Sequence, residues 1–429
     1  MPPATTVADS STHGVCSWLP EGNWEVAMRT SEPTTAHGLA AAGGAAALLA
    51  GHTAAGAARS LAEIAAATAQ LWTRSATEPI SPARAVLDGA HWGSQLVARR
   101  RPRWASPHEI VFEAPIARLR DFSQGAAADV VPTLVLPPQA GHDSCIVDFS
   151  PSQSQLETIR AAGLRRAFAL DWVGATPRTR HTIVEDYIDV IDRAVDAIGG
   201  PVNLIGDCQG GWLGAIYAAL RPERINTLTL AGAPIDFHAG DATIAASTQL
   251  LSGMWGSAPY RTLVTLGGGN MPGQFVLANF IGMQPEAEVG RQLQLLAHLD
   301  DSEHLDRYHA FEDWFKHTQD IPGIFYLWLV EHLFRNNELI RGELRVGGGR
   351  VDLGEITCPL YLLAGETDHI TPPAQLFAAA ESVGTPRGEI TSRTSSGGHL
   401  GLFMGREALR EHWPVLLADV RAHSAPCSP

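Results

Sequence analysis

The feature that most constrains this chain is an apolar strand that breaks into a glycine-rich turn with a cysteine at its centre. The stretch from Val202 reads VNLIGDCQGGW, with Cys208 inside a Gly-x-Cys-x-Gly-Gly turn and an alanine-rich segment after it. A strand-to-helix turn of this spacing strains its central residue and lifts the side chain into a cleft. Gly206 and Gly210 lack the Cβ atoms that would collide there. The pattern predicts a nucleophile elbow with cysteine in place of serine; the alternative is a small buried cysteine that only packs.

Two later segments supply the partners that such an elbow requires, in the chain order nucleophile, acid, histidine. Asp368 follows the apolar run 359–363, at the end of a predicted strand, where active sites gather in open parallel sheets. His399 lies in a glycine-rich loop further on. We predict that His399 is the general base and that Asp368 orients it. Glu366, two residues before Asp368, competes for the role of the acid.

Two backbone N–H groups are candidate donors to the oxyanion of an acyl-transfer intermediate. The first belongs to Gln209, at the start of the helix after the elbow. The second is expected in the loop after the strand 132–136, at Gln139 or Ala140, because the two prolines before them have no N–H. His142 in the same loop either lines the cleft or lies exposed.

These roles predict nucleophilic catalysis on an ester or thioester. His399 takes the proton of Cys208, and the thiolate attacks the carbonyl carbon to form an acyl-enzyme. Because a thiolate is a good leaving group, the acyl group can pass to a hydroxyl acceptor as well as to water. The chemistry therefore favours acyl transfer.

The motifs resemble those of polyhydroxyalkanoate synthases over residues 105–420. The resemblance is carried by residues 206–211, 320–323, Tyr326, Trp328, Asn336, Asn337, Leu339, 350–356 and 368–372. It implies an acyltransferase with a triad of Cys208, Asp368 and His399 that takes 3-hydroxyacyl groups from coenzyme A thioesters and extends a polyester. It implies no cofactor beyond the coenzyme A of the substrate. It also implies a helical N-terminal region concerned with association with polymer granules and with dimerisation.

Other stretches are more similar to the sister group, the intracellular polyhydroxyalkanoate depolymerases, which share the fold and also use cysteine. These stretches are residues 141–142, 170–172, 185–189, 208–209 and 399–406. Three alternatives to polymer synthesis therefore stay open. They are an intracellular depolymerase, a thiol-dependent esterase or thioesterase, and a non-catalytic protein that binds polymer granules.

The chain from about residue 107 alternates strands with helices, which is typical of a largely parallel sheet. We predict strands at 109–114, 117–122, 132–136, 166–171, 201–205, 227–231, 359–363 and 388–394. The alternation stops between the sixth and seventh strands, in a segment rich in aromatic residues. The pattern predicts an α/β fold of the α/β-hydrolase class, with a mostly parallel central sheet, a helical cap insertion and a helical N-terminal region.

The predicted domains follow from this alternation. They are a disordered N-terminus at 1–35, a helical region at 36–104, a hydrolase core at 105–235 and 350–422, a helical cap at 236–349, and a flexible tail at 423–429.

Aromatic side chains of the cap line an acyl channel, form a mobile lid, or simply pack the cap. They include Trp255, Phe275, Phe280, Trp314, Phe315, Phe325, Tyr326 and Trp328. The residues that we predict to contact the substrate are His142, Trp212, Trp314, Trp328 and His369.

Composition limits the partners. The net charge of −14 argues against non-specific binding of nucleic acid, and we expect the basic run 99–103 to be a solvated linker. Five cysteines without metal-ligand spacing or a paired framework suit a reducing cytoplasm. We therefore expect a cytoplasmic protein, associated with granules if the resemblance holds, with no metal, no nucleic acid partner and no transmembrane segment.

Overall fold

The computed structural model describes residue 65 and residues 82–97, 99–127 and 130–424. The predicted disordered N-terminus, most of the predicted helical region before residue 82, and the last five residues lie outside this part of the chain.

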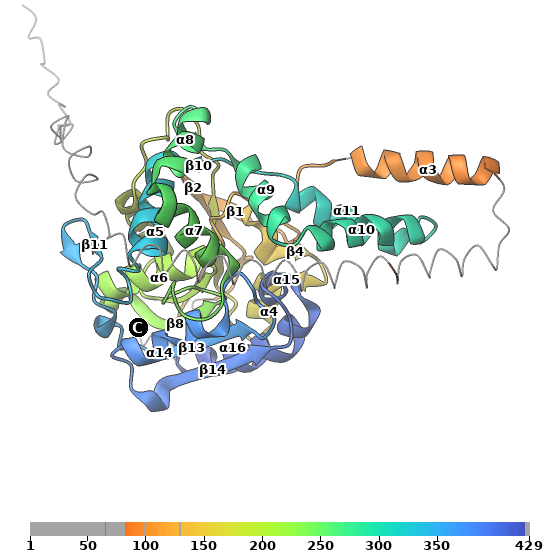
Figure 1. Ribbon diagram of the computed structural model, residues 1–429. Coiled ribbons are helices and arrows are strands. Elements are labelled where there is room, and N and C mark those ends of the chain that lie inside the picture. Colours follow the sequence, from red (N-terminus) through yellow and green to blue (C-terminus); the bar gives the residue numbers. More distant parts are fainter. Residues whose placement is uncertain (1–64, 66–81, 98, 128–129, 425–429) are drawn as a thin grey trace, which may run out of the picture.

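A central sheet of eight strands forms the core (Figure 1). Its strands are β1 (Glu109–Ala114), β2 (Ala117–Asp121), β3 (Thr133–Leu136), β6 (Ala167–Trp172), β7 (Val202–Asp207), β8 (Ile225–Ala231), β13 (Leu360–Gly365) and β14 (Ile390–Ser395). All eight predicted strands are present, each within two residues of the predicted ends.

The order of the strands in the sheet is β1-β2-β6-β3-β7-β8-β13-β14. The pairs β1·β2 and β2·β6 are antiparallel, and the other neighbours in the sheet are parallel. β2 is therefore the one strand of this sheet that runs against the rest. This order, with the second strand reversed, is the arrangement of the α/β-hydrolase fold, and it confirms the predicted fold class.

Both faces of the sheet are covered, because successive side chains of a strand point to opposite faces. In β3, Leu134 and Leu136 join one buried cluster and Val135 joins the other. α5 (Val184–Ile198) and α6 (Gln209–Leu220) cover the first face, and α4 (Gln155–Ala161), α15 (Gly401–Met404) and α16 (Trp413–Ala422) cover the second. The carboxyl ends of the parallel strands stay open to the cap.

The cap lies between β8 and β13. Its elements are α7 (Thr243–Trp255), α8 (Ala258–Leu266), β9 (Asn270–Met271), α9 (Gly273–Met283), α10 (Pro285–Ala297), α11 (Ser302–Phe315), β10 (Ile321–Pro322), α12 (Gly323–Trp328), the π-helix Leu329–Arg335, β11 (Arg345–Val346) and β12 (Gly349–Arg350). The segment is mainly helical, as predicted. It also contains two short antiparallel strand pairs, β9·β10 and β11·β12, which the sequence pattern did not predict.

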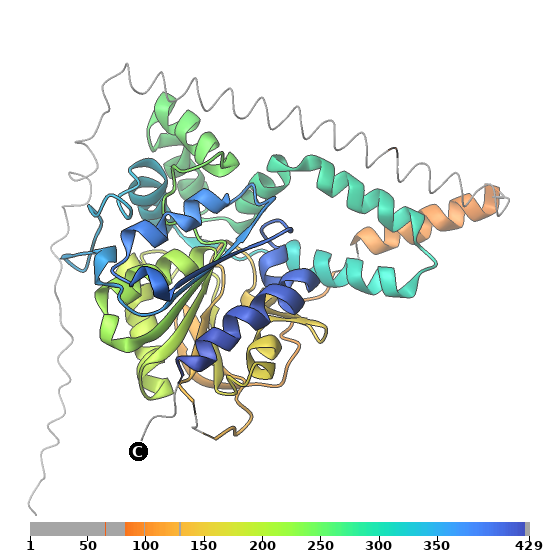
Figure 2. The same ribbon diagram turned by 90° about the horizontal axis from the view of Figure 1, so that it is seen from below.

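Three helices form an arm that projects from the core. α10 and α11 extend side by side, and α3 (Pro82–Val97) runs along them (Figures 1 and 2). Leu295, Leu299 and Tyr308 are buried inside the arm against Trp92 and Leu96 of α3. None of the helices described here combines the length and the apolar character needed to cross a bilayer.

Candidate active site

Cys208 occupies the turn between β7 and α6. Its backbone has φ 51° and ψ −116°, a left-handed conformation that a residue with a side chain rarely adopts. Its N–H donates to the carbonyl of Ala231 in the neighbouring strand at 2.9 Å, which fixes the turn to the sheet. The structure therefore has the strained strand-to-helix geometry of a nucleophile elbow.

Two glycines permit this turn by close approach. A Cβ atom on Gly206 would lie 2.5 Å from the Cα of Gly211, and one on Gly210 would lie 2.0 Å from the carbonyl oxygen of Leu136. Both contacts are far inside van der Waals distance, and both involve backbone atoms that have no alternative rotamer. The spacing of glycines in the motif thus follows from the packing of α6 against β7 and β3.

Replacing Gly210 by alanine is expected to destabilise the protein by about 3 kcal/mol, because the added methyl group meets backbone rather than a movable side chain. Gly214→Ala, in the same helix, is the control, since its Cβ would meet Leu204 at an ordinary 3.4 Å. Urea unfolding monitored by circular dichroism measures both. Equal midpoints for the two variants would contradict the explanation.

Asp368 and His399 meet above the carboxyl ends of β13 and β14. The Oδ2 atom of Asp368 lies 2.7 Å from Nδ1 of His399, and both side chains are buried. Oδ1 of Asp368 accepts hydrogen bonds from the N–H groups of Ile370 and Thr371, at 2.9 and 2.8 Å. The competing acid, Glu366, is exposed, and the structure brings Asp368 rather than Glu366 to the imidazole.

The electrostatics of His399 combine two opposing effects. Burial disfavours its imidazolium form, but the charges and hydrogen bonds of Asp368 and Cys208 outweigh burial and raise the pKa of His399 well above its usual value. The side chain of Cys208 thus acts on the same ring that Asp368 holds. Cys208, His399 and Asp368 therefore lie together in one chain of neighbouring residues at the site.

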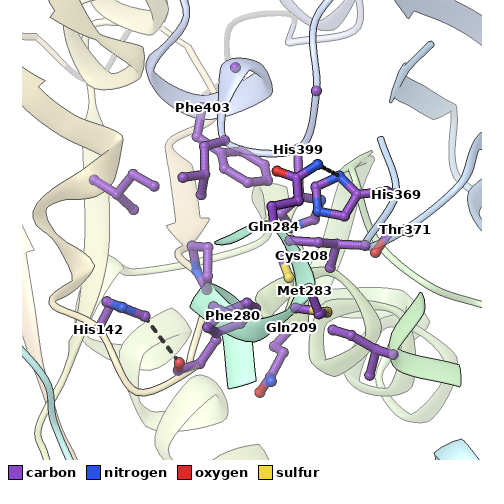
Figure 3. A pocket seen from close by; sticks show the side chains of 18 of the residues that line it. His142, Cys208, Gln209, Phe280, Met283, Gln284, His369, Thr371, His399 and Phe403 are labelled. Carbon is purple, nitrogen blue, oxygen red and sulfur yellow. Dashed lines mark hydrogen bonds between the residues drawn. The ribbon is translucent and has the colours of Figure 1, made fainter. Parts of the chain in front are cut away.

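The cavity above this chain, called here the Cys208 cavity, has a volume of about 440 Å³. Figure 3 shows Cys208 and His399 facing the same space as Phe280 and Met283 of α9 and Gln284, the residue after it. Apolar side chains of the core and cap make up most of its wall. Of the predicted site residues, the lining includes Ala140, His142, Cys208, Gln209, Trp212, Trp314, His369 and His399.

The candidate oxyanion donors differ in their placement. Gln209 is the first residue of α6, so its N–H has no partner within the helix, and the residue lines the Cys208 cavity. Ala140 also lines the cavity. The side chain of Gln139 turns away and donates to the hydroxyl of Tyr187 at 3.2 Å, and Gln139 does not line the cavity. The choice between the backbone N–H groups of Gln139 and Ala140 as the second donor stays a prediction.

His142 lies in the cavity wall and is buried rather than exposed. Burial lowers the pKa of its imidazole to about 4, so the ring is neutral at physiological pH. Its two nitrogens lie 3.2 Å from the carbonyl oxygen of Ala140 and 3.0 Å from that of Phe315, at the end of α11. The ring also stacks on Phe315. His142 therefore links the loop after β3 to the cap.

The predicted aromatic contacts divide between cavity and packing. Trp212 and Trp314 line the Cys208 cavity, and Trp314 is held by a hydrogen bond from Nε1 to the carbonyl of Asp143 at 2.8 Å. Trp328 does not line it and packs against Trp212 instead. Of the eight cap aromatics singled out from the sequence, those that line the cavity are Phe280, Trp314 and Phe315.

Two further features of the site concern His369, which was predicted from the sequence, and Asp207, which was not. His369 approaches Gln284 of the cap, with its Nδ1 3.2 Å from the side-chain amide nitrogen (Figure 3). Asp207, the last residue of β7, is fully buried beside Cys208 and accepts a hydrogen bond from Gln155 at 3.2 Å. Burial raises the pKa of Asp207 to about 8, although the hydrogen bond from Gln155 and the charge of His399 oppose the shift.

The described part of the chain holds no group of three or more histidine, cysteine, aspartate or glutamate side chains arranged to bind a metal ion.

The chain matches one protein family and is similar to several known proteins. A family model described as "Protein of unknown function (DUF3141)" matches residues 118–418. The poly(3-hydroxyalkanoate) polymerase subunit PhaC of Allochromatium vinosum is 27% identical over 63% of this chain and 75% of its own. PhaC of Haloferax mediterranei is 26% identical over 72% of this chain, which spans 63% of that relative's length. These similarities confirm the resemblance to polyhydroxyalkanoate synthases.

A solved structure, the monoacylglycerol lipase of Paleococcus ferrophilus, is 18% identical over 69% of this chain and 98% of its own, with a TM-score of 0.41.

Proposed function

The chain belongs to the DUF3141 family, described as proteins of unknown function, and we propose an activity for it from its own site. The activity is acyl transfer from 3-hydroxyacyl-coenzyme A thioesters, through Cys208, to a growing polyester. The observation that carries the proposal is that Cys208 and His399, which is paired with Asp368, lie together in the lining of a mostly apolar cavity. Similarity to PhaC polymerase subunits supports the choice of thioester and polyester.

The chemistry proceeds in two displacements. His399 takes the thiol proton of Cys208, and the sulfur attacks the thioester carbonyl carbon. The N–H groups of Gln209 and Ala140 stabilise the oxyanion, and the coenzyme A thiolate leaves with the proton held by His399. His399 then takes the proton of an acceptor hydroxyl, whose oxygen attacks the acyl-enzyme and releases the Cys208 thiolate, which regains its proton. Asp368 stabilises the imidazolium in both halves.

The apolar wall of the Cys208 cavity supports a hydroxyl of the polyester as the acceptor rather than bulk water. A polyester chain end buries its methylene and methyl groups in such a cavity and displaces water from the acyl-enzyme. We place the reaction in the cytoplasm, where a working thiol stays reduced, at the surface of polymer granules.

One experiment separates this activity from its competitors. The purified protein is incubated with 3-hydroxybutyryl-coenzyme A and, separately, with amorphous polyhydroxybutyrate, while free coenzyme A, soluble 3-hydroxy acid and insoluble polymer are measured. We expect release of coenzyme A together with insoluble product. Soluble acid released from the polymer would instead identify a depolymerase, and turnover of short p-nitrophenyl esters alone would identify an esterase. No turnover of any substrate would favour a granule-binding protein.

A further inference from the structure

The densest positive charge of this acidic chain has no part in the site described so far. Residues 99–103 read RRRPR in a chain whose net charge is −14. A basic run of this kind is expected to be a solvated linker when nothing holds its backbone. The structure shows a segment that is fixed in position.

The basic segment is anchored on both sides. The N–H of Arg100 donates to the carboxylate of Asp313 in α11 at 2.9 Å. After the run, the N–H of Ala105 donates to the carbonyl of Asp148 in the core at 3.1 Å. The segment therefore bridges the projecting arm and the core, and its arginines stand at a defined place. The arginines of this linker are exposed, as expected, and its backbone is held at both ends.

The arginines border a recess of about 440 Å³, called here the arginine recess. Its lining includes Arg100, Arg101, Arg103, Phe149, Asp313 and Trp314. Within the described residues, the guanidinium groups of Arg100, Arg101 and Arg103 form no ion pair. Asp313 supplies one negative charge against their three, so the recess keeps an excess of positive charge.

The arginine recess adjoins the Cys208 cavity. Trp314 lines both spaces. Arg291 of α10 also lines the Cys208 cavity on this side, stacked on Phe311 and Phe315 of α11. The positively charged segment thus lies beside the Cys208 cavity.

We propose that the arginine recess binds the phosphate groups of the nucleotide end of a coenzyme A thioester while the acyl end reaches Cys208. The proposal rests on the proposed function and specifies its substrate. Coenzyme A carries a diphosphate and a 3′-phosphate at one end and the thioester at the other, joined by an extended pantetheine arm. Guanidinium groups suit phosphate because their planar N–H fork matches the phosphate oxygens. Phe149, which is half-buried, offers aromatic surface for the adenine ring.

The test compares thioesters with and without the nucleotide. The triple variant Arg100→Gln, Arg101→Gln, Arg103→Gln removes the guanidinium groups and keeps long polar side chains. We expect its KM for 3-hydroxybutyryl-coenzyme A to rise by about tenfold or more, with kcat near that of the parent. The KM for 3-hydroxybutyryl-N-acetylcysteamine, which has no phosphate, should stay unchanged. The triple variant Arg165→Gln, Arg178→Gln, Arg410→Gln removes three exposed positive charges elsewhere and is the matched control.

A direct binding measurement tests the arginine recess without requiring turnover of a substrate. Calorimetric titration with 3′-phospho-ADP, a probe that lacks the acyl and pantetheine parts, should show binding to the parent and to the control variant, and at least tenfold weaker binding to the recess variant. If the parent fails to release coenzyme A, the proposed function falls, and this titration alone decides on the recess. Equal binding by all three proteins would overturn the phosphate site, as would an equal rise of KM for both thioesters. Binding of phosphatidylglycerol vesicles without binding of 3′-phospho-ADP would overturn it in favour of a lipid surface.

Discussion

Replacing Cys208 by alanine is expected to lower the rate of acyl transfer by about 10⁴-fold or more, because no other group can form the acyl-enzyme. Cys145 and Cys358 are the other cysteines in the part of the chain that the structure describes. Burial, with the nearby charge of Asp143, raises the pKa of the Cys145 thiol well above its usual value. Burial raises the pKa of the Cys358 thiol to about 12. Both stay protonated at neutral pH and are poor nucleophiles.

The measurement is the release of coenzyme A from 3-hydroxybutyryl-coenzyme A at saturating substrate. Cys358→Ala is the control, and its rate should equal that of the parent. Mass spectrometry after brief treatment with iodoacetamide should find the label on Cys208 and on neither Cys145 nor Cys358. If the Cys208→Ala protein keeps the parent's rate, Cys208 is not the nucleophile.

The second large effect concerns stability and its dependence on pH. Asp207→Asn is expected to raise the free energy of unfolding by about 4 kcal/mol at pH 7. The carboxyl of Asp207 has its pKa raised from 3.8 to about 8 by burial in the folded protein. Between these values the unfolded chain releases the proton while the folded protein keeps it, so ionisation favours unfolding increasingly as pH rises. About three pH units at 1.36 kcal/mol each separate pH 7 from the lower value.

The amide side chain of the Asp207→Asn variant keeps an oxygen that accepts the hydrogen bond from Gln155. The amide cannot ionise, so the variant does not lose folding stability as the pH rises. Urea unfolding at several pH values measures the effect. The stability gained by Asp207→Asn should be near zero below pH 4, should grow up to pH 8, and should then stay level. Asp241→Asn, which removes an exposed carboxylate at the start of the cap, is the matched control. A gain that is the same at pH 4 and pH 8 would contradict the explanation.

Much of the fold follows from local patterns. The inner strands β3, β6, β7, β8 and β13 are short, mostly apolar runs, and strands of this kind are recognisable without tertiary information. The elbow is also local, because Gly206 and Gly210 are needed within one turn of chain. The short pairs β9·β10 and β11·β12 were missed, since two paired residues on each side leave no alternation to detect.

The site was predicted less evenly than the fold. Cys208, Asp368 and His399 each follow a recognisable strand, and the carboxyl ends of parallel strands share one edge of the sheet. Gln139 and Trp328 were grouped with the site because they stand in the right segments. The side chain of Gln139 contacts Tyr187 and that of Trp328 packs on Trp212, so neither side chain lines the Cys208 cavity.

The sequence by itself determined the fold class, the elbow and the chain order of nucleophile, acid and histidine, because these depend on periodicity and on spacing along the backbone. Only the tertiary structure decided that Asp368 rather than Glu366 meets His399, that Asp207 is buried, and that the basic run 99–103 stands beside the Cys208 cavity. Each of these depends on contacts between segments far apart in the chain. Such contacts are set by the packing of the cap and arm on the sheet, which local patterns do not encode.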